Sequence, residues 1–387
     1  MSDSQPQHGG SAPRPRLAGE LAGACGDLGT FIPHVVGAMT VAGLAPAGVL
    51  FGFGLSLVAS GLFYGLPMAV QPMKAVSAVL LTGQLTPEAT AAAGLVIGAL
   101  LLALATTGLI GRLARLIPQS VIAGLQLGLG LGMGWLGLHM VAGMPWIGLP
   151  ALALLLGLPR LWPQAPAAPL VLLAAIGAGL STGLTTLPAA PGFAPHFPAL
   201  ALPGSWTTLW QAAERAVLPQ LPLTLTNAVI VTAALCRDLY PERAARATVR
   251  NLALTSGLAN LLLAPFGAMP MCHGAGGVAA QHRFGARTGL APVLFGLALL
   301  VLALGFAGSA AALFAAIPPA AVGALLLVAG GDLALSRRLF DARRACWPAI
   351  GLTAAATALL NPALGLAAGW AMEAARAALG RPRGRAA

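Results

Sequence analysis

A single lysine lies within an apolar segment that contains two prolines. The segment LPMAVQPMKAVSA covers residues 66–78, and Lys74 is its one ionisable residue. Proline lacks the backbone N–H that a helix interior uses, while its fixed φ suits the first helical turn. We therefore predict that Pro72 begins a helix with Lys74 in its first turn, and that residues 67–71 approach it as extended chain. The free N–H groups and positive dipole end of such a helix suit an anion, and Lys74 adds a full charge.

The same proline spacing recurs in the second part of the chain. PFGAMPM at 265–271 shares the P-x4-P-M pattern of PMAVQPM at 67–73, at an offset of 198 residues. A second pair, IPQSVIAGLQLGLG at 117–130 and IPPAAVGALLLVAG at 317–330, follows at an offset of 200. Two matches in the same order predict a duplicated half. Pro270 is then expected to begin a second helix, whose N-terminus faces the first across one central site.

Polar side chains near the two prolines complete a candidate anion-binding site. Gln71 and Ser77 offer hydrogen-bond donors from the first half, and His273 offers one from the second. Thr226 and Asn227 add a hydroxyl and an amide from a neighbouring apolar segment. The predicted binding residues are Gln71, Pro72, Met73, Lys74, Ser77, Thr226, Asn227, Met271, Cys272, His273 and Gly274.

These assignments have structural alternatives. Lys74 could instead extend its amine to an interface with water. His273 could be a packing histidine whose hydrogen bonds are satisfied within the protein, and Cys272 could be a small packing residue. Thr226 or Asn227 could bond the helical turn behind it.

Asp27 is the one carboxylate that lies well inside an apolar segment of the first half. A charged group in such a position is costly, so it is a functional candidate. Asp27, with Thr30 beside it, is predicted to pair with Lys74, to carry a coupling proton or to bind Na⁺. The alternative is a structural carboxylate that is hydrogen-bonded to nearby backbone. An offset of 200 places Asn227 at the equivalent position of the second half.

The composition places these residues in a membrane. The chain has 387 residues, of which 58% are hydrophobic and 8% charged, with a mean hydropathy of +0.85. A soluble domain carries about 25% charged residues. The net charge of +11 comes from arginines scattered between apolar segments, so no nucleic-acid-binding face is expected. The four cysteines show neither disulfide nor metal-ligand spacing, and no cofactor is expected.

Apolar segments of about 20 residues, enough to cross about 30 Å of hydrocarbon, recur along the chain and predict transmembrane spans. In the first half we place them at 18–40, 45–66, 72–83, 88–110, 116–139, 143–159 and 167–187. In the second half we place them at 216–236, 247–264, 270–281, 289–308, 310–330, 345–360 and 362–379. Spans 3 and 10 are short enough to be half-helices. Seven spans per half is an odd number, so the halves should run through the membrane in opposite directions.

Arginine placement agrees with this topology. With the N-terminus inside, the predicted cytoplasmic segments hold 19 of the 21 Lys and Arg residues, and only Lys74 and Arg215 are left over. This is the bias that the positive-inside rule describes. We therefore predict an all-α polytopic protein of the inner (plasma) membrane, with 14 spans as inverted repeats and both termini in the cytoplasm. Its parts are a disordered tail at 1–16, a first repeat at 17–187, an extracytoplasmic linker at 188–215 and a second repeat at 216–380.

Four segments together resemble the molybdate transporter family, a branch of the sulfate permease superfamily. They are GDLGTFIPHV (26–35), LPMAVQPMKAVSA (66–78), LPLTLTNAVIVTA (221–233) and PFGAMPMCHGAGGVAAQHRFGARTG (265–289). The resemblance implies the seven-plus-seven inverted repeat fold, with tetrahedral oxyanions such as molybdate or sulfate as substrates. It also implies that the cytoplasmic STAS domain of typical sulfate permeases is absent. The implied core domain covers 17–110 and 216–309, and the implied gate domain covers 111–187 and 310–380.

The predicted function is secondary active transport of molybdate across the inner membrane by alternating access. Sulfate, which has the same charge and shape, is the first alternative. An anion channel and a nucleobase permease of the same fold are less favoured. The permease should have a carboxylate near the second half-helix, and the only acid from Leu239 to Gly331 is Glu242.

The predicted partners follow from this function. They are the oxyanion, a coupling proton or Na⁺, and the lipid bilayer, with a homodimer left open and nucleic acid excluded. The sequence has no H-E-x-x-H motif, no G-x-S-x-G in a plausible context and no clustered acids for a metal, so the chain is not expected to be an enzyme.

Overall fold

The structure of the protein is a computed structural model that describes residues 17–163, 165–186, 192–200, 202 and 204–379. The predicted disordered tail at 1–16 lies outside the described residues. The elements of the first part of the chain are α1 (Leu17–Ala24), α2 (Leu28–Thr40), α3 (Pro46–Tyr64), β1 (Val70–Pro72), α4 (Lys74–Leu81), α5 (Pro87–Thr107), α6 (Ile110–Leu116), α7 (Gln119–Gly143), α8 (Pro145–Leu161) and α9 (Ala167–Ser181).

The second part of the chain begins with one long helix that contains two π-helical stretches, so the segments from Trp206 to Leu239 are continuous. They are α10 (Trp206–Ala212), η1 (Ala213–Val217), α11 (Leu218–Leu223), η2 (Thr224–Val231) and α12 (Thr232–Leu239). The following elements are η3 (Ala244–Arg246), α13 (Val249–Leu263), η4 (Ala264–Phe266), β2 (Met271–His273), α14 (Ala275–Arg283), α15 (Leu290–Gly305), α16 (Ala307–Ala315), α17 (Pro319–Ala334), α18 (Arg337–Phe340), η5 (Arg344–Cys346), α19 (Trp347–Leu359) and α20 (Pro362–Leu379). Helix α10 begins within the segment that was expected to link the two halves.

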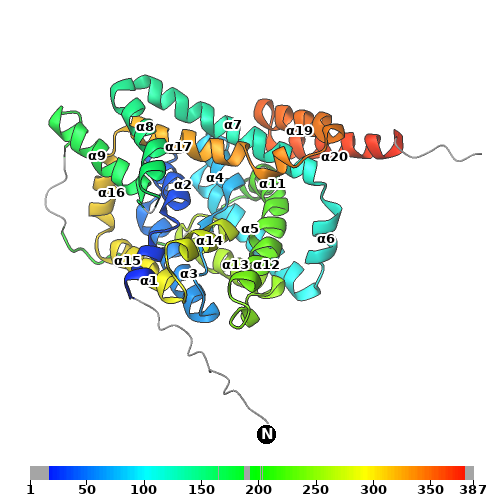
Figure 1. The fold of residues 1–387 in the computed structure, drawn as a ribbon, viewed down its shortest axis with the longest axis horizontal. Coiled ribbons are helices and arrows are strands. Elements are labelled where there is room, and N and C mark those ends of the chain that lie inside the picture. The colour runs from blue at the N-terminus through cyan, green and yellow to red at the C-terminus, as the bar shows by residue number, and fades with distance from the viewer. Residues whose placement is uncertain (1–16, 164, 187–191, 201, 203, 380–387) are drawn as a thin grey trace, which may run out of the picture.

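The helices lie in two groups. In Figure 1, α7, α8, α17, α19 and α20 lie along the upper side, and α1, α3, α12, α13 and α15 lie below them. Helix α7 packs along α17, α3 along α15, and α5 along α13. Glycine allows the first of these approaches, because a Cβ at Gly130 would lie 2.5 Å from the carbonyl oxygen of Gly330. The upper group comes from the segments assigned to the gate and the lower group from those assigned to the core.

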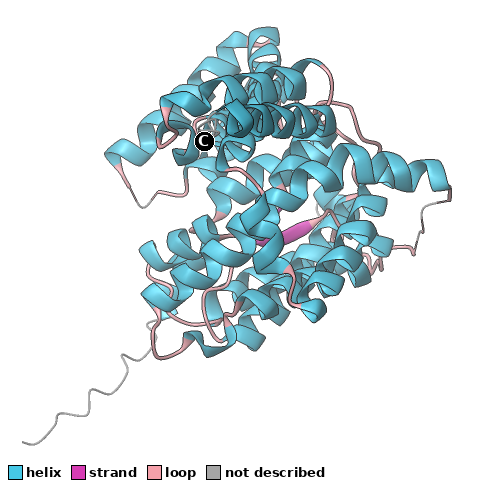
Figure 2. Ribbon diagram, turned by 90° about the vertical axis from the view of Figure 1, so that its right-hand side faces the viewer, coloured by secondary structure: helices cyan, strands magenta, loops and turns pink. Residues whose placement is uncertain are grey.

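A short two-stranded sheet lies in the middle of the molecule (Figure 2). Strands β1 and β2 pair in an antiparallel register, with Val70 opposite His273, Gln71 opposite Cys272 and Pro72 opposite Met271. The backbone N–H of Met73 donates to the carbonyl of Pro270 and continues the ladder by one bond of 2.9 Å. Extended chain before the first short helix is therefore confirmed, whereas the second extended segment, expected at 265–269, begins in the 3₁₀ helix η4 and becomes a strand only at Met271. Segments about 200 residues apart meet in one sheet.

The predicted start of each short helix was wrong. Helix α4 begins at Lys74 and α14 at Ala275, not at Pro72 and Pro270. Pro72 ends β1, because pairing with β2 keeps its backbone extended, and Pro270 precedes β2. The two helix starts are thus 201 residues apart, and the two P-x4-P-M motifs occupy different positions relative to their helices.

The span boundaries differ from the prediction at two further places. The first predicted span is broken between α1 and α2, and Asp27 is the N-cap residue of α2. The predicted span at 310–330 contains the end of the short helix α16 and then α17, which begins after Pro318. Proline cannot donate to the preceding helical turn, and it favours a helix start at this point.

Four described helices are long and apolar enough to cross a membrane individually. They are α3, α5, α7 and the continuous helix from Trp206 to Leu239. Helices α15 and α16 form a fifth span if the bend of 98° between them lies within the membrane. The structure therefore has several membrane-spanning helices, while the count of 14 and the inverted repeat remain predictions.

Candidate anion-binding site

A cavity of about 190 Å³ lies where the first turns of α4 and α14 meet the two strands. It is lined by Gln71, Pro72, Lys74, Gln126, Gln220, Leu223, Asn227, Ala228, Cys272, His273, Gly274, Ala275 and Gly276. Seven of these residues belong to the predicted binding set, so the structure brings most of that set together. Met73, Ser77, Thr226 and Met271 do not line the cavity. Among the residues that do line it there is no carboxylate.

Lys74 supplies the positive charge of this cavity. It is the first residue of α4 and is half-buried. Within the described chain, its amine has neither a salt bridge nor a hydrogen bond to another side chain or carbonyl. A lysine that lines an internal cavity without a fixed partner can bind an anion without first breaking an ion pair.

The first turn of α4 is already capped by a side chain that was not among the predicted binding residues. The carbonyl oxygen Oε1 of the buried Gln220 accepts hydrogen bonds from the backbone N–H groups of Ala75, at 2.8 Å, and Val76, at 3.4 Å. Its amide nitrogen donates to Thr224 at 2.9 Å. Two of the N–H groups that we expected to face the anion are therefore occupied, because a neutral amide satisfies them within the protein.

The first turn of α14 has no such cap. Its N-cap residue, Gly274, makes no side-chain cap, and Ala275 and Gly276 line the cavity. The first N–H groups of a helix have no intrahelical acceptor. The two short helices therefore contribute differently: α4 provides the charge of Lys74, and α14 provides backbone donors.

Asp27 is buried, with 4% of its surface exposed, and lies next to the cavity rather than in its wall. Its Oδ1 accepts a hydrogen bond of 2.5 Å from Nε2 of Gln71, and the backbone N–H of Thr30 donates to its carbonyl at 3.1 Å. No salt bridge joins Asp27 to Lys74, so the predicted ion pair is not formed. A Cβ at Gly277 would lie 2.6 Å from Oδ2, so glycine is required for α14 to pass so close to Asp27.

Ser77 faces a histidine instead of the cavity. Its hydroxyl lies 2.8 Å from Nδ1 of His34 on α2, and both residues are buried. His34 was not among the predicted site residues. A histidine within an apolar segment was the available signal, and it stands in the GDLGTFIPHV segment.

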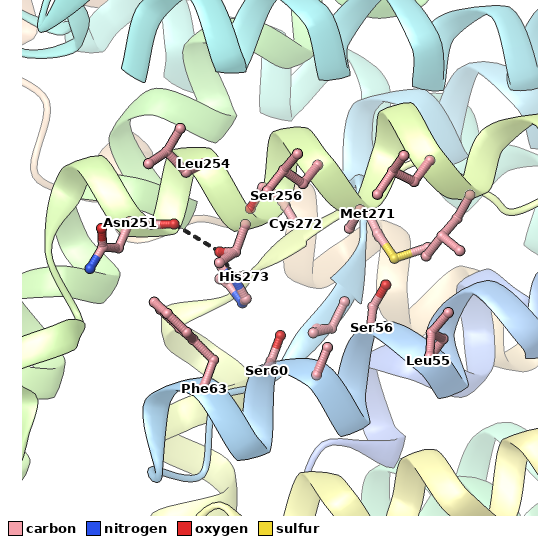
Figure 3. A pocket seen from close by; sticks show the side chains of 17 residues that line it. Leu55, Ser56, Ser60, Phe63, Asn251, Leu254, Ser256, Met271, Cys272 and His273 are labelled. Atoms are coloured by element: carbon pink, nitrogen blue, oxygen red, sulfur yellow. Dashed lines mark hydrogen bonds between the residues drawn. The ribbon is translucent and has the colours of Figure 1, made fainter. Parts of the chain in front are cut away.

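The ring of His273 is fully hydrogen-bonded within the protein. Nε2 lies 2.7 Å from the hydroxyl of Thr255, and Nδ1 lies 3.2 Å from the carbonyl oxygen of Ala69. Tyr64 lies 2.8 Å from the same Thr255 hydroxyl. Figure 3 shows the ring of His273 beside α13, facing the neighbouring helix α3. The prediction that this ring donates to an anion is therefore wrong, since neither nitrogen is free, and the packing alternative describes it.

Two polar residues of η2 have partners of different kinds. The hydroxyl of Thr226 donates to the carbonyl of Pro222 at 2.8 Å. This residue therefore bonds the helical turn behind it, which was the structural alternative to a binding role. Asn227 lines the cavity, and its Oδ1 accepts a bond of 2.7 Å from Nη2 of Arg338. Nε of Arg338 also donates to Gln119 at 2.7 Å, so this arginine joins η2 to the start of α7.

Gln126 is the one α7 residue that lines the cavity, and it was not among the predicted binding residues. It is buried, and its Oε1 has no hydrogen-bond partner. An unpaired buried acceptor is costly, so Oε1 indicates contact with a hydrogen-bond donor such as water, while the amide nitrogen is the atom that could donate to an anion.

The remaining predicted residues are buried and uncharged. Met73 and Met271 are buried, and Asn260 bonds both the N–H and the carbonyl of Met271. Cys272 is a buried free thiol. In the part of the chain that the structure describes, no group of three His, Cys, Asp or Glu side chains could hold a metal ion.

The fold is that of a known class of anion transporters. The transmembrane domain of the cyanobacterial bicarbonate transporter BicA matches with a TM-score of 0.68 at 18% identity, over 93% of this chain and 98% of that one. Murine Slc26a9, an anion transporter in its inward-facing state, matches with a TM-score of 0.72 at 14% identity, over 95% of this chain and 69% of that one. At these identities the likeness concerns the fold.

Sequence comparison then gives the family. The model described as "Molybdate transporter of MFS superfamily" matches residues 19–133 and 212–333, and the chain belongs to this molybdate transporter family. Molybdate transporter 2 of Arabidopsis thaliana is 33% identical over 83% of this chain and 79% of its own length. Molybdate transporter 1 of Chlamydomonas reinhardtii is 31% identical over 81% of this chain and 83% of its own length. Of the two ranges that the family model matches, the first includes β1 and α4 and the second includes β2 and α14.

Proposed function

We propose that the chain is a secondary active transporter that carries molybdate across the inner membrane. The observation that carries this proposal is the joint lining of one cavity by Lys74 and the uncapped first turn of α14, with no carboxylate among the lining residues. Helix N-termini and lysine both favour negative charge, and a dianion gains from both. The names of the curated relatives favour molybdate as the cargo.

The oxyanion would sit between the two helix starts. Lys74 would pair with one oxygen, and the N–H groups of Ala275 and Gly276 would donate to others. Gln71, Asn227 and Gln126 would supply amide donors around it. Since Gln126 belongs to α7 and Lys74 to α4, the anion would touch both the proposed gate and the proposed core, and transport would proceed by movement of one against the other.

Accumulation of a dianion requires a coupled cation. Inward movement of two negative charges costs roughly 2 × 2.3 kcal/mol per 100 mV of negative-inside potential. We assign the coupling proton to Asp27, because it is buried and Gln71 connects it to the cavity. Na⁺ is the alternative ion. The cytoplasmic location of both termini and the inverted repeat belong to the same proposal.

Sulfate is the second candidate cargo, because it has the charge and tetrahedral shape that this cavity would recognise. A nucleobase permease is disfavoured, since no lining carboxylate is available to accept ring N–H groups. A channel would share the cavity but would not need a coupling acid.

Uptake into proteoliposomes tests the proposal. We expect saturable molybdate uptake that competes with sulfate and rises with an inward proton gradient. Saturable nucleobase uptake without oxyanion uptake would contradict the proposed cargo. Oxyanion flux without saturation or counterflow would instead indicate a channel.

A further inference from the structure

A second and larger cavity, of about 520 Å³, lies between α3 and α13. Figure 3 shows its walls: Leu55, Ser60 and Phe63 on α3 face Leu254 of α13, with His273 of β2 between the two helices. Its lining is predominantly apolar, and it has no charged side chain. Cys272 and His273 line this groove as well as the anion cavity.

The groove runs along both helices. Its α3 wall contains Leu55, Ala59 and Phe63, which are four residues apart and therefore share one face of the helix. From Leu55 to Phe63 the helix rises about 12 Å, and from Asn251 to Leu262 α13 rises about 16 Å, at roughly 1.5 Å per residue. One leaflet of a bilayer holds about half of the 30 Å hydrocarbon thickness. The groove therefore has the length of a single acyl chain.

The rim of the groove is open to the surroundings of the protein. Leu258 and Leu262 of α13 are 46% and 61% exposed, and Leu55 of α3 is 39% exposed. Helix α3 is long and apolar enough to cross the membrane. In a bilayer these side chains would face lipid, so the medium next to the groove already supplies acyl chains.

One end of the groove carries positive charge. The guanidinium of Arg246 lies 5.6 Å from the centre of the Phe63 ring and donates to the carbonyl of Phe63 at 2.8 Å. Arg243 donates to the carbonyl of Gly65 at 2.9 Å, just beyond the end of α3. Both arginines are exposed, and neither forms a salt bridge with a carboxylate of the described chain. Arg243 also donates to the carbonyl of Arg287 at 3.1 Å, so an anionic headgroup at this end would meet two guanidinium groups that are held by backbone carbonyls and have no carboxylate partner in the described chain.

We propose that this groove is a binding site for one anionic phospholipid. One acyl chain lies between α3 and α13, and the phosphate lies against Arg246 and Arg243. Because β2 forms the wall of both cavities, the bound chain also holds in place the strand that borders the anion site. The lipid site does not depend on which oxyanion the protein carries.

Photolabelling tests the site directly. The protein is reconstituted in phosphatidylcholine vesicles that contain phosphatidylglycerol with a diazirine on one acyl chain, then irradiated, and the labelled peptides are mapped. We expect labels to concentrate on 55–63 and 251–262. Leu297 and Val301 of α15 are also exposed, and they report ordinary contact with bulk lipid. Equal labelling of α15 and the groove would overturn the proposal.

Two variants separate the chain from the headgroup. Ala59→Phe fills the groove from an exposed position and should remove the groove label, whereas Val301→Phe should leave it. Arg246→Gln should lower labelling by phosphatidylglycerol about five-fold and leave labelling by a phosphatidylcholine probe unchanged. Groove labelling that survives Ala59→Phe, or that is equal for both lipids and insensitive to Arg246→Gln, contradicts the proposal. Size-exclusion chromatography checks folding, and Ser60→Phe replaces Ala59→Phe if that variant aggregates.

Discussion

Gln71 connects the buried acid to the anion cavity through a single side chain. Its Nε2 donates to Oδ1 of Asp27 at 2.5 Å, and the same residue lines the cavity beside Lys74. A proton on Asp27 would weaken this charge-assisted hydrogen bond and so change the position of an amide that faces the anion. We therefore expect binding in the cavity to depend on the charge of Asp27, although Asp27 forms no ion pair with Lys74.

Lys74→Met should abolish high-affinity oxyanion binding and leave the protein folded. Methionine keeps the length of the chain and removes the charge, and the loss of a hydrogen bond to a charged group corresponds to about 10- to 100-fold in affinity. Isothermal titration or competitive uptake measures the effect. Arg112→Met, at an exposed site on α6, is the control for loss of one positive charge. Unchanged affinity in Lys74→Met would favour the alternative in which the amine of this lysine extends to an interface with water.

Asp27→Asn should separate exchange from accumulation. Asparagine keeps an acceptor for Gln71 but cannot be charged, so counterflow of labelled oxyanion should persist while stimulation by a proton gradient disappears. Asp238→Asn removes an exposed carboxylate on α12 and should behave like the unmodified protein. If Asp27→Asn accumulates oxyanion with the original response to pH, Asp27 is a structural residue and the coupling site lies elsewhere.

Two adjacent glycines of α14 should respond differently to alanine. A Cβ at Gly277 would lie 2.4 Å from the Cβ of Ala69 and 2.6 Å from Oδ2 of Asp27, so Gly277→Ala should destabilise the protein by about 1–3 kcal/mol. A Cβ at Gly276 meets no atom within 4 Å, so Gly276→Ala should not lower stability. Thermal unfolding of the detergent-solubilised protein compares them. Equal melting temperatures would mean that α14 does not pass as close to Asp27 as the structure places it.

Gln220→Met should weaken the first turn of α4. The substitution removes the acceptor of the Ala75 and Val76 N–H groups, and the loss of such a cap costs about 1–2 kcal/mol. Hydrogen exchange should become faster at these two amides, and the melting temperature should fall. Gln211→Met, at an exposed position of α10, is the matched control. Unaltered exchange at Ala75 and Val76 would show that another group caps this helix.

The sequence by itself determined the class of the protein and pointed to the centre of its candidate site. Long apolar segments with few charges leave only a membrane as the environment, because the charged fraction is too small for a soluble surface. Proline before Lys74 required an interruption of the helix, since proline cannot donate the hydrogen bond that a continuous helix needs. Asp27 could be identified as a candidate because an acid within an apolar segment is energetically costly.

Tertiary structure decided which groups surround that centre. Gln220 caps α4 from 145 residues away, and Arg338 reaches Asn227 from 111 residues away, so no local pattern could reveal either contact. Pairing of β1 with β2 moved the helix starts from Pro72 and Pro270 to Lys74 and Ala275, because the ladder keeps the intervening backbone extended. The ring of His273 turned out to be bonded to Thr255 and Ala69, since a residue type shows its hydrogen-bonding capacity but not which partners the fold brings to it.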